Sequence, residues 1–426
     1  MKNNREKTLV LVTGSYPFSV AGENTFVPQE IEILSRHYKN VVLIPKRIEG
    51  VCETINEKNV GVEKSYAIYI NSQAAKIVAL PLLIFDLMLY KEYINHAKLI
   101  FSYPRVILTI LRSRLYSIMS ERWFRKFISS NNWSSDSCVL FTWWFDPSTL
   151  GLLDYADIKK IPVITRAHGY DLYEERHTPS YIPFRDHAIK KICAVYTDSA
   201  TGRDYLSKKY PQFQQKIETG LLGIKDPKYT NQPSDDGIFR IQTCSFLLPV
   251  KRIDLLIKGL SELAISYPSN KFRWNHIGNG PEKEKMIDMA NRLLGLNLEF
   301  SFIDYPGKNE LNDYYNTNQV DLFINVSKSE GTPVSIMEAI SFGIPIMATS
   351  VGGNKEIVID YRTGILIGED PTPAFIAEQI GFLLFEKEKL AAMRKESKQQ
   401  WFKNYNAEKN YELFVKSVSD KIENFK

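Results

Sequence analysis

The chain has 426 residues, which at roughly 100–200 residues per domain predicts two or three domains. Apolar residues make up 44% of the sequence and aromatic residues 12%, enough for sizeable buried cores, which excludes a disordered chain and a small disulfide-stapled protein. With 54 basic and 49 acidic residues the net charge is only +5, which permits an anionic ligand but does not indicate a nucleic-acid binder.

The first 45 residues predict the start of a parallel α/β sheet. Only four apolar residues, 9–12, follow the basic start, whereas the apolar region of a secretory signal needs roughly 7–15, so this run predicts a first strand. A loop with glycine, proline and serine, a helical stretch and a second apolar run follow it. This order is the building block of a parallel sheet with helices on both faces.

The cysteines are far apart in the sequence, at Cys52, Cys138, Cys193 and Cys244. Their spacings fit neither a zinc site nor a CxxC redox motif. Scattered thiols without a secretory signal are typical of a reducing compartment, so we expect a cytoplasmic protein without disulfides.

Residues 73–128 are the irregular part of the N-terminal half. Its apolar runs are interrupted, and none supplies the about 20 predominantly apolar residues of a transmembrane helix. Residues 98–126 carry seven basic residues and one acidic residue, a net charge of +6, with a helical apolar period. This segment predicts helices that pack on the sheet with a solvated basic face, or a patch that contacts an anionic membrane surface.

A polar, turn-rich stretch at residues 230–237 separates two halves that have the same strand–helix rhythm. We therefore expect one doubly wound α/β domain at residues 1–230, a second at residues 237–395, and a terminal helix at residues 396–426. Ligands of such sheets bind outside the carboxyl ends of the strands, so two facing sheets predict a cleft between the domains.

Residues 327–345 predict a short helix that begins just after an apolar strand. Thr332 is a good N-cap, and Pro333 suits the first helical position, where a missing N–H costs nothing. Gly343 predicts the end of this helix.

The first turn of this helix predicts an anion site. The free amides of Gly331, Thr332 and Val334, together with the helix dipole, would bind a phosphate. Glu330 stands just before the helix and Glu338 lies within it. A carboxylate beside a phosphate pocket would accept hydrogen bonds from ribose or hexose hydroxyls, although the helix dipole alone also favours a glutamate at this end.

With the residues after it, this stretch resembles the signature of the retaining family-4 glycosyltransferases. The signature has two glutamates eight residues apart, a G-x-P strand and a GG-x-x-E turn, supplied here by Gly352, Gly353 and Glu356. The resemblance covers nearly the whole chain, is closest to the exopolysaccharide and colanic-acid-type branch, and implies the α/β GT-B fold, with two Rossmann-like doubly wound domains facing across a cleft. It also implies that Glu330 contacts the donor sugar and Glu338 the nucleotide ribose.

Residues 248–256 are similar to the family's phosphate-lysine segment. Lys251, at a strand–helix junction, would then neutralise the diphosphate leaving group. The family usually has an arginine a few residues earlier, where this chain has Phe246. Either Arg252 compensates for this change, or Lys251 and the helix amides alone hold the phosphate.

Further loops resemble parts of the family's site. His168, in an HG-x-D loop after a strand, would line the reaction centre, and the terminal helix resembles one that crosses back to the first domain. The resemblance thus implies catalytic roles for His168, Lys251 and Glu330, and donor-binding roles for Gly22, Lys251, Arg252, Gly278, Asn279, Glu330, Gly331, Thr332, Pro333, Val334 and Glu338.

The resemblance implies a hexosyltransferase that transfers a sugar from a UDP- or GDP-sugar with retention at the anomeric carbon. The second domain would bind the nucleotide-sugar, and the first a glycan or lipid-linked acceptor of bacterial surface polysaccharide synthesis. We expect no cofactor and no metal ion, since a cation and a helix terminus replace magnesium and no Asp-x-Asp motif is apparent. No nucleic-acid partner is expected, and residues 98–126 would contact the cytoplasmic face of the inner membrane.

Two other functions compete with this interpretation. A catalytically silent GT-B protein would serve as a membrane-peripheral scaffold, but the presence of Lys251, Glu330 and Glu338 argues against it. A GT-B phosphorylase would need a pyridoxal-phosphate lysine context, which the sequence does not indicate.

Overall fold

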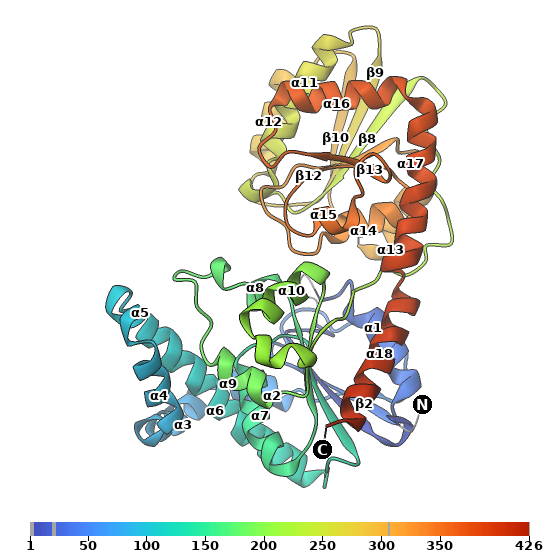
Figure 1. Cartoon of the computed structure of the whole chain (residues 1–426). Coiled ribbons are helices and arrows are strands. Elements are labelled where there is room, and N and C mark those ends of the chain that lie inside the picture. The colour runs from blue at the N-terminus through green and yellow to red at the C-terminus, as the bar shows by residue number, and fades with distance from the viewer. Residues whose placement is uncertain (1–3, 19–22, 306, 426) are drawn as a thin grey trace. The chain divides into compact units, whose positions relative to one another are not determined.

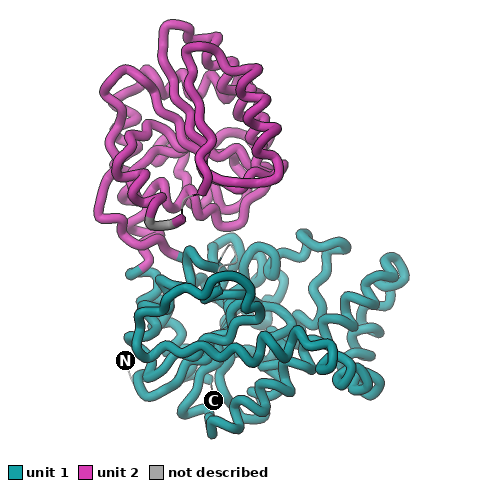
Figure 2. Tube along the Cα trace, turned by 180° about the vertical axis from the view of Figure 1, so that it is seen from behind, with its two compact units in different colours: residues 1–222, 408–426 teal, residues 223–407 magenta. Residues whose placement is uncertain are grey.

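The computed structural model describes residues 4–18, 23–305 and 307–425, and the chain divides into two compact units (Figures 1 and 2). Unit 1 comprises residues 1–222 and 408–426, and unit 2 comprises residues 223–407. Each unit is a parallel sheet covered by helices, so both halves have the doubly wound α/β architecture that the sequence predicts.

Unit 1 is built on a seven-stranded sheet with the order β3-β2-β1-β4-β5-β6-β7. Its central strands β1 and β4 are mostly apolar, and every residue of both is buried, as expected for parallel strands covered on both faces. In the register, Thr8 of β1 lies opposite Asn40 of β2 and Cys138 of β4. The strands are β1 (Thr8–Thr13), β2 (Asn40–Pro45), β3 (Val60–Val62), β4 (Cys138–Thr142), β5 (Val163–Ala167), β6 (Ala194–Thr197) and β7 (Ile217–Thr219).

The helices of unit 1 cover this sheet, and the long helix α6 packs along α7. Helices α3, α4 and α5 also contact α6 and lie together at one side of the unit (Figure 1). The helices are α1 (Val27–His37), α2 (Ser65–Asn71), α3 (Gln73–Ala79), the 3-10 helix η2 (Leu80–Phe85), α4 (Leu87–Asn95), α5 (Ala97–Ser102), α6 (Val106–Ser130), α7 (Pro147–Lys159), α8 (Gly169–Leu172), α9 (Arg185–Lys191), α10 (Ala200–Lys209) and α18 (Ala407–Glu423).

The C-terminal helix α18 packs in unit 1 from residue 408 onward. The Phe414 ring lies 4.2 Å from the guanidinium carbon of Arg166 on β5, and Tyr196 on β6 shares a hydrogen bond with Ser417. The sequence predicts one helix at residues 396–426. In the structure, α17 ends at Gln400, a π-helix follows over Trp401–Tyr405, and α18 begins at Ala407.

Unit 2 has a six-stranded parallel sheet with the order β10-β9-β8-β11-β12-β13. Helices α11 and α16 lie side by side over it (Figure 1). The elements are β8 (Ile238–Cys244), α11 (Ile253–Ser266), β9 (Lys271–Ile277), α12 (Lys283–Leu293), β10 (Leu298–Ile303), α13 (Lys308–Thr317), β11 (Leu322–Asn325), α14 (Val334–Ser341), β12 (Ile346–Thr349), α15 (Asn354–Ile357), β13 (Gly364–Ile367), α16 (Pro373–Phe385) and α17 (Lys387–Gln400).

The polar stretch 230–237 belongs to unit 2 and does not form a free linker. Asn231 donates to the carbonyls of Tyr315 and Asn318, and the guanidinium of Arg394 donates to the side-chain oxygen of Asn231. Just before this stretch, the carbonyl of Ile224 accepts hydrogen bonds from residues 401 and 407. The division between the units therefore falls between residues 222 and 223. Hydrogen bonds of the Asn231 side chain make the polar stretch part of unit 2, although its composition alone indicates a linker.

No single helix of the described residues is both long and apolar enough to cross a membrane. One bent pair, Ser65–Asn71 with Gln73–Phe85, meets that length and composition test only when the two parts are taken together, and the bend between them is 65°.

Both sheets have a topological switch point, where consecutive connections leave in opposite directions. In unit 1 it lies between β1 and β4, and in unit 2 between β8 and β11. Ligands of open α/β sheets bind at such points, outside the carboxyl ends of the strands. The loops after β1, β4, β8 and β11 are therefore where functional side chains are expected.

Candidate functional site

The loops after β8 and β11 bring Lys251 and Glu330 together. Lys251 ends a single 3-10 turn, Pro249–Lys251, between β8 and α11, and Glu330 lies between β11 and α14. The Lys251 Nζ donates to Glu330 Oε1 at 2.6 Å, and Asn325 and Ser327 donate to the same oxygen at 3.1 and 2.6 Å. Two predicted site residues, 79 positions apart in the chain, thus make a direct ion pair at the switch point of unit 2.

Helix α14 begins one residue later than the sequence predicts. Its N-cap is Pro333 and not Thr332, and Val334 is the first helical residue. Pro333 has φ −77° and ψ 95°, which is extended backbone, so the proline ends the loop and does not start the helix. The end of the helix is as predicted, because Gly343 follows it with a φ of +73°, a conformation that favours glycine.

The first turn of α14 presents backbone N–H groups beside the ion pair. The carbonyl of Pro333 accepts hydrogen bonds from the amides of Ile336 and Met337, each at 3.2 Å. The amides of Val334 and Ser335 precede these bonds, at the helix end where the macrodipole is positive. This end of the helix has the donors and the sign of charge that an anion needs.

A glycine pair after β12 supports the loop that carries Glu330. A Cβ atom at Gly352, whose φ is +47°, would lie 2.0 Å from the carbonyl oxygen of Glu330, and one at Gly353 would lie 2.2 Å from that of Gly331. The Gly353 amide donates to this Gly331 carbonyl at 3.0 Å. Only glycine permits such close backbone packing, which explains the two glycines of the motif.

Glu338 is buried on α14, near the end of β8. Burial raises the pKa of the Cys244 thiol and of the Tyr305 hydroxyl, and the negative charge of Glu338 raises both further. The structure therefore places this carboxylate next to the carboxyl end of β8. Its contact with a ribose stays a prediction.

The Arg252 side chain already has partners within the protein. Its guanidinium donates to the carbonyls of Val326, Ser327 and Glu369 and to the carboxylate of Asp370, at 2.7 to 3.2 Å. These bonds tie the loop after β11 to the loop after β13. Of the two alternatives for the missing arginine, this geometry favours phosphate binding by Lys251 and the helix amides.

The loop with Gly278 and Asn279 packs directly on the segment that carries Phe246. Gly278 has φ +144°, and a Cβ there would lie 2.0 Å from the carbonyl oxygen of Ser245. The Leu247 amide donates to the carbonyl of Asn279 at 2.7 Å. Phe246 itself is exposed, so a larger polar side chain would have room at this position.

The switch point of unit 1 is filled by a carboxylate of its own chain. Glu23 is buried and accepts hydrogen bonds from the amides of Gly14, Ser15 and Tyr16 at 2.6, 2.7 and 2.9 Å. The indole N–H of Trp144, after β4, donates to the same carboxylate at 2.5 Å. The amides that could bind an anionic ligand here are already occupied.

Sequence reasoning did not single out Glu23 as a site residue. It named Gly22 in the same loop, which lies outside the described residues. A usable signal is present, because a loop that turns sharply just after a strand leaves several amides without partners, and an acidic residue within reach will bind them.

His168 lies at the end of β5 with both ring nitrogens engaged. Nε2 is 3.0 Å from the carbonyl oxygen of Trp143 and Nδ1 is 3.4 Å from Asp198, while the ring contacts the Trp144 ring at a centroid distance of 4.8 Å. Its amide donates to Asp171 at 2.7 Å, which starts helix α8. Burial lowers the pKa of His168, but the hydrogen bond and charge of Asp198 outweigh it and raise that pKa above its usual value.

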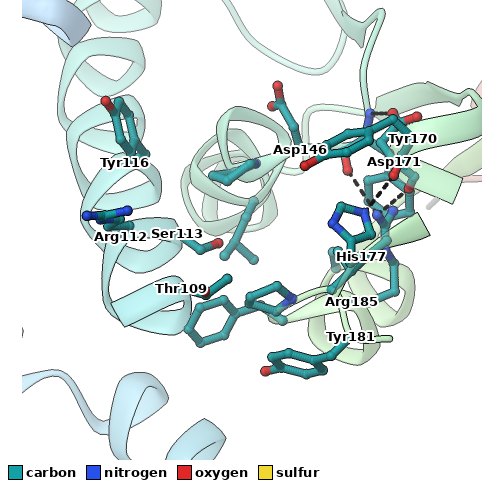
Figure 3. Close-up of a pocket in the computed structure, with 17 residues that line it drawn as sticks. Thr109, Arg112, Ser113, Tyr116, Asp146, Tyr170, Asp171, His177, Tyr181 and Arg185 are labelled. Carbon is teal, nitrogen blue, oxygen red and sulfur yellow. Dashed lines mark hydrogen bonds between the residues drawn. The ribbon is translucent and has the colours of Figure 1, made fainter. Parts of the chain in front are cut away.

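Two adjoining pockets open in unit 1. One of about 450 Å³ lies at the carboxyl ends of β1, β2 and β4 and is lined by Glu23, Lys46, Trp144 and Asp146, among others. The other, of about 360 Å³, lies between α6 and residues 170–185 (Figure 3). Its lining includes Thr109, Arg112, Ser113, Tyr116, Asp146, Tyr170, Asp171, His177, Tyr181 and Arg185.

The pair Lys46 and Asp146 is a second feature that sequence reasoning missed. Lys46 follows β2 directly, Asp146 is the N-cap of α7, and the two side chains form an ion pair. Burial raises the pKa of Asp146, but Lys46 and Ser148 hold it below its usual value, so the carboxylate stays charged. Both residues come just after an apolar strand, and that position was the available signal.

The basic segment 98–126 is not uniformly solvated. Arg114 on α6 is buried between Asp86 and Asp154, with hydrogen bonds of 2.9 Å to each. Arg125 pairs with Glu121 on the same helix. The solvated basic face predicted for this segment thus holds only in part, because some of its charges are neutralised within unit 1.

Comparison with protein-family models gives a match within unit 2. Residues 233–400 match the family model for glycosyl transferases group 1. This part of the chain belongs to that family. The GtfA subunit of a UDP-N-acetylglucosamine–peptide N-acetylglucosaminyltransferase from Streptococcus pneumoniae is 30% identical over 193 residues, 44% of this chain and 36% of GtfA. A putative colanic acid biosynthesis glycosyltransferase, WcaL of Escherichia coli, is 22% identical over 255 residues, 57% of this chain and 61% of WcaL.

The chain spans 36–47% of the length of the GtfA relatives that it matches. Over nearly its full length it is similar in fold to a glycosyltransferase from Rickettsia africae, with a TM-score of 0.67, 13% identity and coverage of 98% and 99% of the two chains. Anabaena HepE in complex with UDP-glucose gives a TM-score of 0.64 at 13% identity and covers 97% and 99%. The group 1 domain is thus one of two Rossmann-like domains of a GT-B fold.

Proposed function

We propose that the chain is a retaining hexosyltransferase that transfers a sugar from a nucleotide-sugar to a glycan or lipid-linked acceptor in bacterial surface polysaccharide synthesis. The observation that carries this proposal is the contact between Lys251 and Glu330 at the unit 2 switch point, beside the first turn of α14. One cation and a row of helix amides are suited to a diphosphate, and a carboxylate next to them is suited to sugar hydroxyls.

The ion pair suggests how the site would engage its donor. A diphosphate at the first turn of α14 would compete for the Lys251 ammonium, which Glu330 now neutralises. Glu330 would then accept hydrogen bonds from the sugar, with Asn325 and Ser327 still orienting it. Charge on Lys251 and the amides would stabilise the leaving diphosphate.

Retention follows from the family resemblance. Double displacement would need a carboxylate nucleophile about 5 Å from its acid partner. In the mechanism of the family, the acceptor hydroxyl instead attacks the anomeric carbon on the face that the diphosphate leaves. The new carbon–oxygen bond forms as the bond to phosphate breaks, and a diphosphate oxygen takes the proton of the acceptor.

A UDP-sugar is the first donor to test, with GDP-sugars second. The GtfA relatives are described as UDP-N-acetylglucosamine transferases, and HepE is described in complex with UDP and UDP-glucose. Those names belong to the relatives and support the choice of the test compound.

The pocket between α6 and residues 170–185 is our candidate acceptor site (Figure 3). It joins aromatic side chains, Tyr116, Tyr170 and Tyr181, with Arg112, a combination suited to an acceptor that carries both a sugar or lipid and a phosphate. A lipid-linked acceptor would require contact with the inner membrane face, for which the basic segment 98–126 is one candidate.

Replacement of Glu330 separates an enzyme from a silent scaffold. We expect Glu330→Ala to lower sugar transfer from a UDP-sugar at least 100-fold, while circular dichroism shows that the variant still folds. The matched control is Glu299→Ala, which removes an exposed glutamate of the same sheet that pairs with Arg273. Transfer at the normal rate by Glu330→Ala, or its absence from the wild-type protein with every donor, would contradict the proposal.

Metal independence is part of the same proposal. Transfer should be unchanged in EDTA, since Lys251 and the α14 amides supply the positive charge. Loss of transfer in EDTA with recovery on addition of manganese would contradict this part alone.

A further inference from the structure

A large share of the exposed apolar side chains of this protein lies on one short segment of unit 1. Of the 30 large apolar side chains exposed in the described part of the chain, 13 fall between Ile77 and Leu108. The most exposed are Phe101 at 90%, Phe85 at 84%, Leu87 at 83% and Ile94 at 75%. We call these 13 side chains, on η2, α3, α4, α5 and the start of α6, the apolar surface.

The helices that carry the apolar surface are apolar on both faces. Their inner side chains, including Ala79, Leu83, Leu89, Val106 and Ile110, are buried in the core of unit 1. Apolar side chains on the outer face of a helix, opposite a buried face, are suited to a further covering layer. Contiguous exposed apolar side chains mark a surface that binds another apolar body.

The charges around the apolar surface have one sign. Its exposed charged residues are Lys91, Lys98, Arg105 and, on the next turns of α6, Arg112. The two acidic residues of this segment face inward. Asp86 accepts a hydrogen bond from Arg114 at 2.9 Å, and Glu92 accepts one from Tyr181 and one from the amide of residue 184, at 2.5 and 2.8 Å.

We propose that the apolar surface docks unit 1 onto an anionic lipid bilayer. Apolar side chains would enter the interface, and the basic residues at their edge would meet the anionic headgroups. A second copy of the chain fits less well, because a two-fold contact through this face would bring the basic residues of both copies together. The contact differs from the one that the sequence predicts over residues 98–126, since it lies mainly upstream and depends on apolar side chains.

The position of the apolar surface connects it to the proposed acceptor site. Helix α6 begins within the apolar surface, at Ile107 and Leu108, and then presents Thr109, Arg112 and Ser113 to the pocket of Figure 3. A membrane-bound acceptor would therefore reach the pocket from the side that faces the lipid. This link rests on the proposed function, whereas binding to lipid does not.

Vesicle sedimentation with the full-length chain tests the docking. We expect the wild-type protein to bind vesicles that contain 30% phosphatidylglycerol at least tenfold more tightly than vesicles of pure phosphatidylcholine. The variant Phe85→Ser/Leu87→Ser/Phe101→Ser should bind both at least tenfold more weakly, with an unchanged unfolding temperature because these side chains are exposed. The control Ile265→Ser/Leu296→Ser/Phe385→Ser removes three exposed apolar side chains of unit 2 and should bind as the wild type does.

Equal binding by the Phe85 variant and the wild type, or no binding of the wild type to either vesicle, would overturn the proposal. So would a wild-type dimer in light scattering that the Phe85 variant turns into a monomer, since a second copy would then cover the surface. The vesicles carry no donor and no acceptor, so a failure here leaves the proposed transfer reaction intact, and the Glu330→Ala assay leaves the lipid result intact.

Discussion

The two switch points have the same α/β geometry, but they differ in whether their loop N–H groups already bind a carboxylate of the chain itself. In unit 1, the amides after β1 and the indole after β4 bind a carboxylate of the chain itself, Glu23. In unit 2, the carboxylate after β11, Glu330, pairs with the Lys251 ammonium, and the first amides of α14 lie beside them. An amide group that is satisfied internally stabilises the fold, and one that is not is available to a ligand.

This contrast supports the proposal that unit 2 binds the nucleotide-sugar. Both sheets are doubly wound, and both have glycine-containing loops at the switch point, so fold alone does not distinguish them. What differs is where the donors of these loops already have partners. Four changes to the two units test this comparison, in order of decreasing expected effect.

Glu23→Gln would test the internal role of the carboxylate in unit 1. Glutamine would present an NH2 donor to N–H groups that need an acceptor. We therefore expect the free energy of unfolding of unit 1 to fall by about 3 kcal/mol. Urea unfolding measures this, with Glu49→Gln, an exposed glutamate of the same unit, as the control. Nucleotide affinity should not change. A stable variant with weakened nucleotide binding would mean that unit 1 holds the nucleotide.

Lys251→Ala would remove the ammonium group that donates to Glu330. The affinity for UDP should fall by roughly 100-fold, about 2.7 kcal/mol, because charge-assisted hydrogen bonds to the diphosphate are lost. Calorimetric titration measures this, and Lys258→Ala, on the exposed face of α11, should bind UDP as the wild type does. Unchanged affinity in Lys251→Ala would exclude the lysine from phosphate binding.

A pH titration would compare the two units through their buried histidines. Burial lowers the pKa of His276 to about 4, although a hydrogen bond to the carbonyl of Ser245 opposes this shift. Between the ordinary value of about 6.5 and about 4, the unfolded chain binds a proton that the folded chain does not. Stability is therefore lost as the pH falls through that window, by about 2 kcal/mol at pH 5.

His168 should behave in the opposite way, because its folded pKa is raised. Its contribution to stability is fully present below the ordinary pKa and is lost as the pH rises through the raised value. Unfolding as a function of pH, with His276→Gln and His168→Gln as separate variants, measures both. A loss of the acid-side destabilisation in His168→Gln and not in His276→Gln would contradict the assignment.

Phe246→Arg would restore the arginine that the family resemblance leads one to expect. Because Phe246 is exposed beside the Gly278 loop, we expect an arginine to fit and to tighten UDP binding about fivefold, near 1 kcal/mol. Phe246→Gln is the uncharged control and should leave affinity unchanged. A gain in both variants would mean that removal of the aromatic ring, and not the added charge, is responsible.

The sequence predicted the parts of the site that local chain geometry determines. A strand followed by a proline and a glycine-terminated helix is a local pattern, so the short helix and the place of Glu330 before it could be inferred from the sequence. The close packing of Gly352 and Gly353 on the Glu330 loop came only from the structure. The sequence also places Lys251 and Glu330 next to strands of the second domain, but their direct ion pair is known only from the structure. The doubly wound halves followed from the strand–helix rhythm.

The parts that the sequence could not give depend on long-range side-chain partners. Arg252 donates to carbonyls 74 to 117 residues away in the chain, and no local sequence pattern predicts these partners. The same holds for Asn231, whose side-chain contacts make the polar stretch part of unit 2. The apolar surface could not be predicted for a related reason. Composition shows how many apolar residues a segment has, but not which of them remain exposed after the core has formed.

The most direct test of the central claim is a thermal-shift titration of the wild-type protein with UDP, GDP, ADP, CMP and their common sugar conjugates, with and without EDTA. A ligand that binds only the folded state at a hundredfold excess over its Kd adds about 2.7 kcal/mol of stability. We predict a selective rise with one nucleotide, unaffected by EDTA and lost in Lys251→Ala but kept in Glu23→Gln. No rise with any nucleotide, or a rise that survives Lys251→Ala, would contradict the assignment of the donor site to the unit 2 switch point.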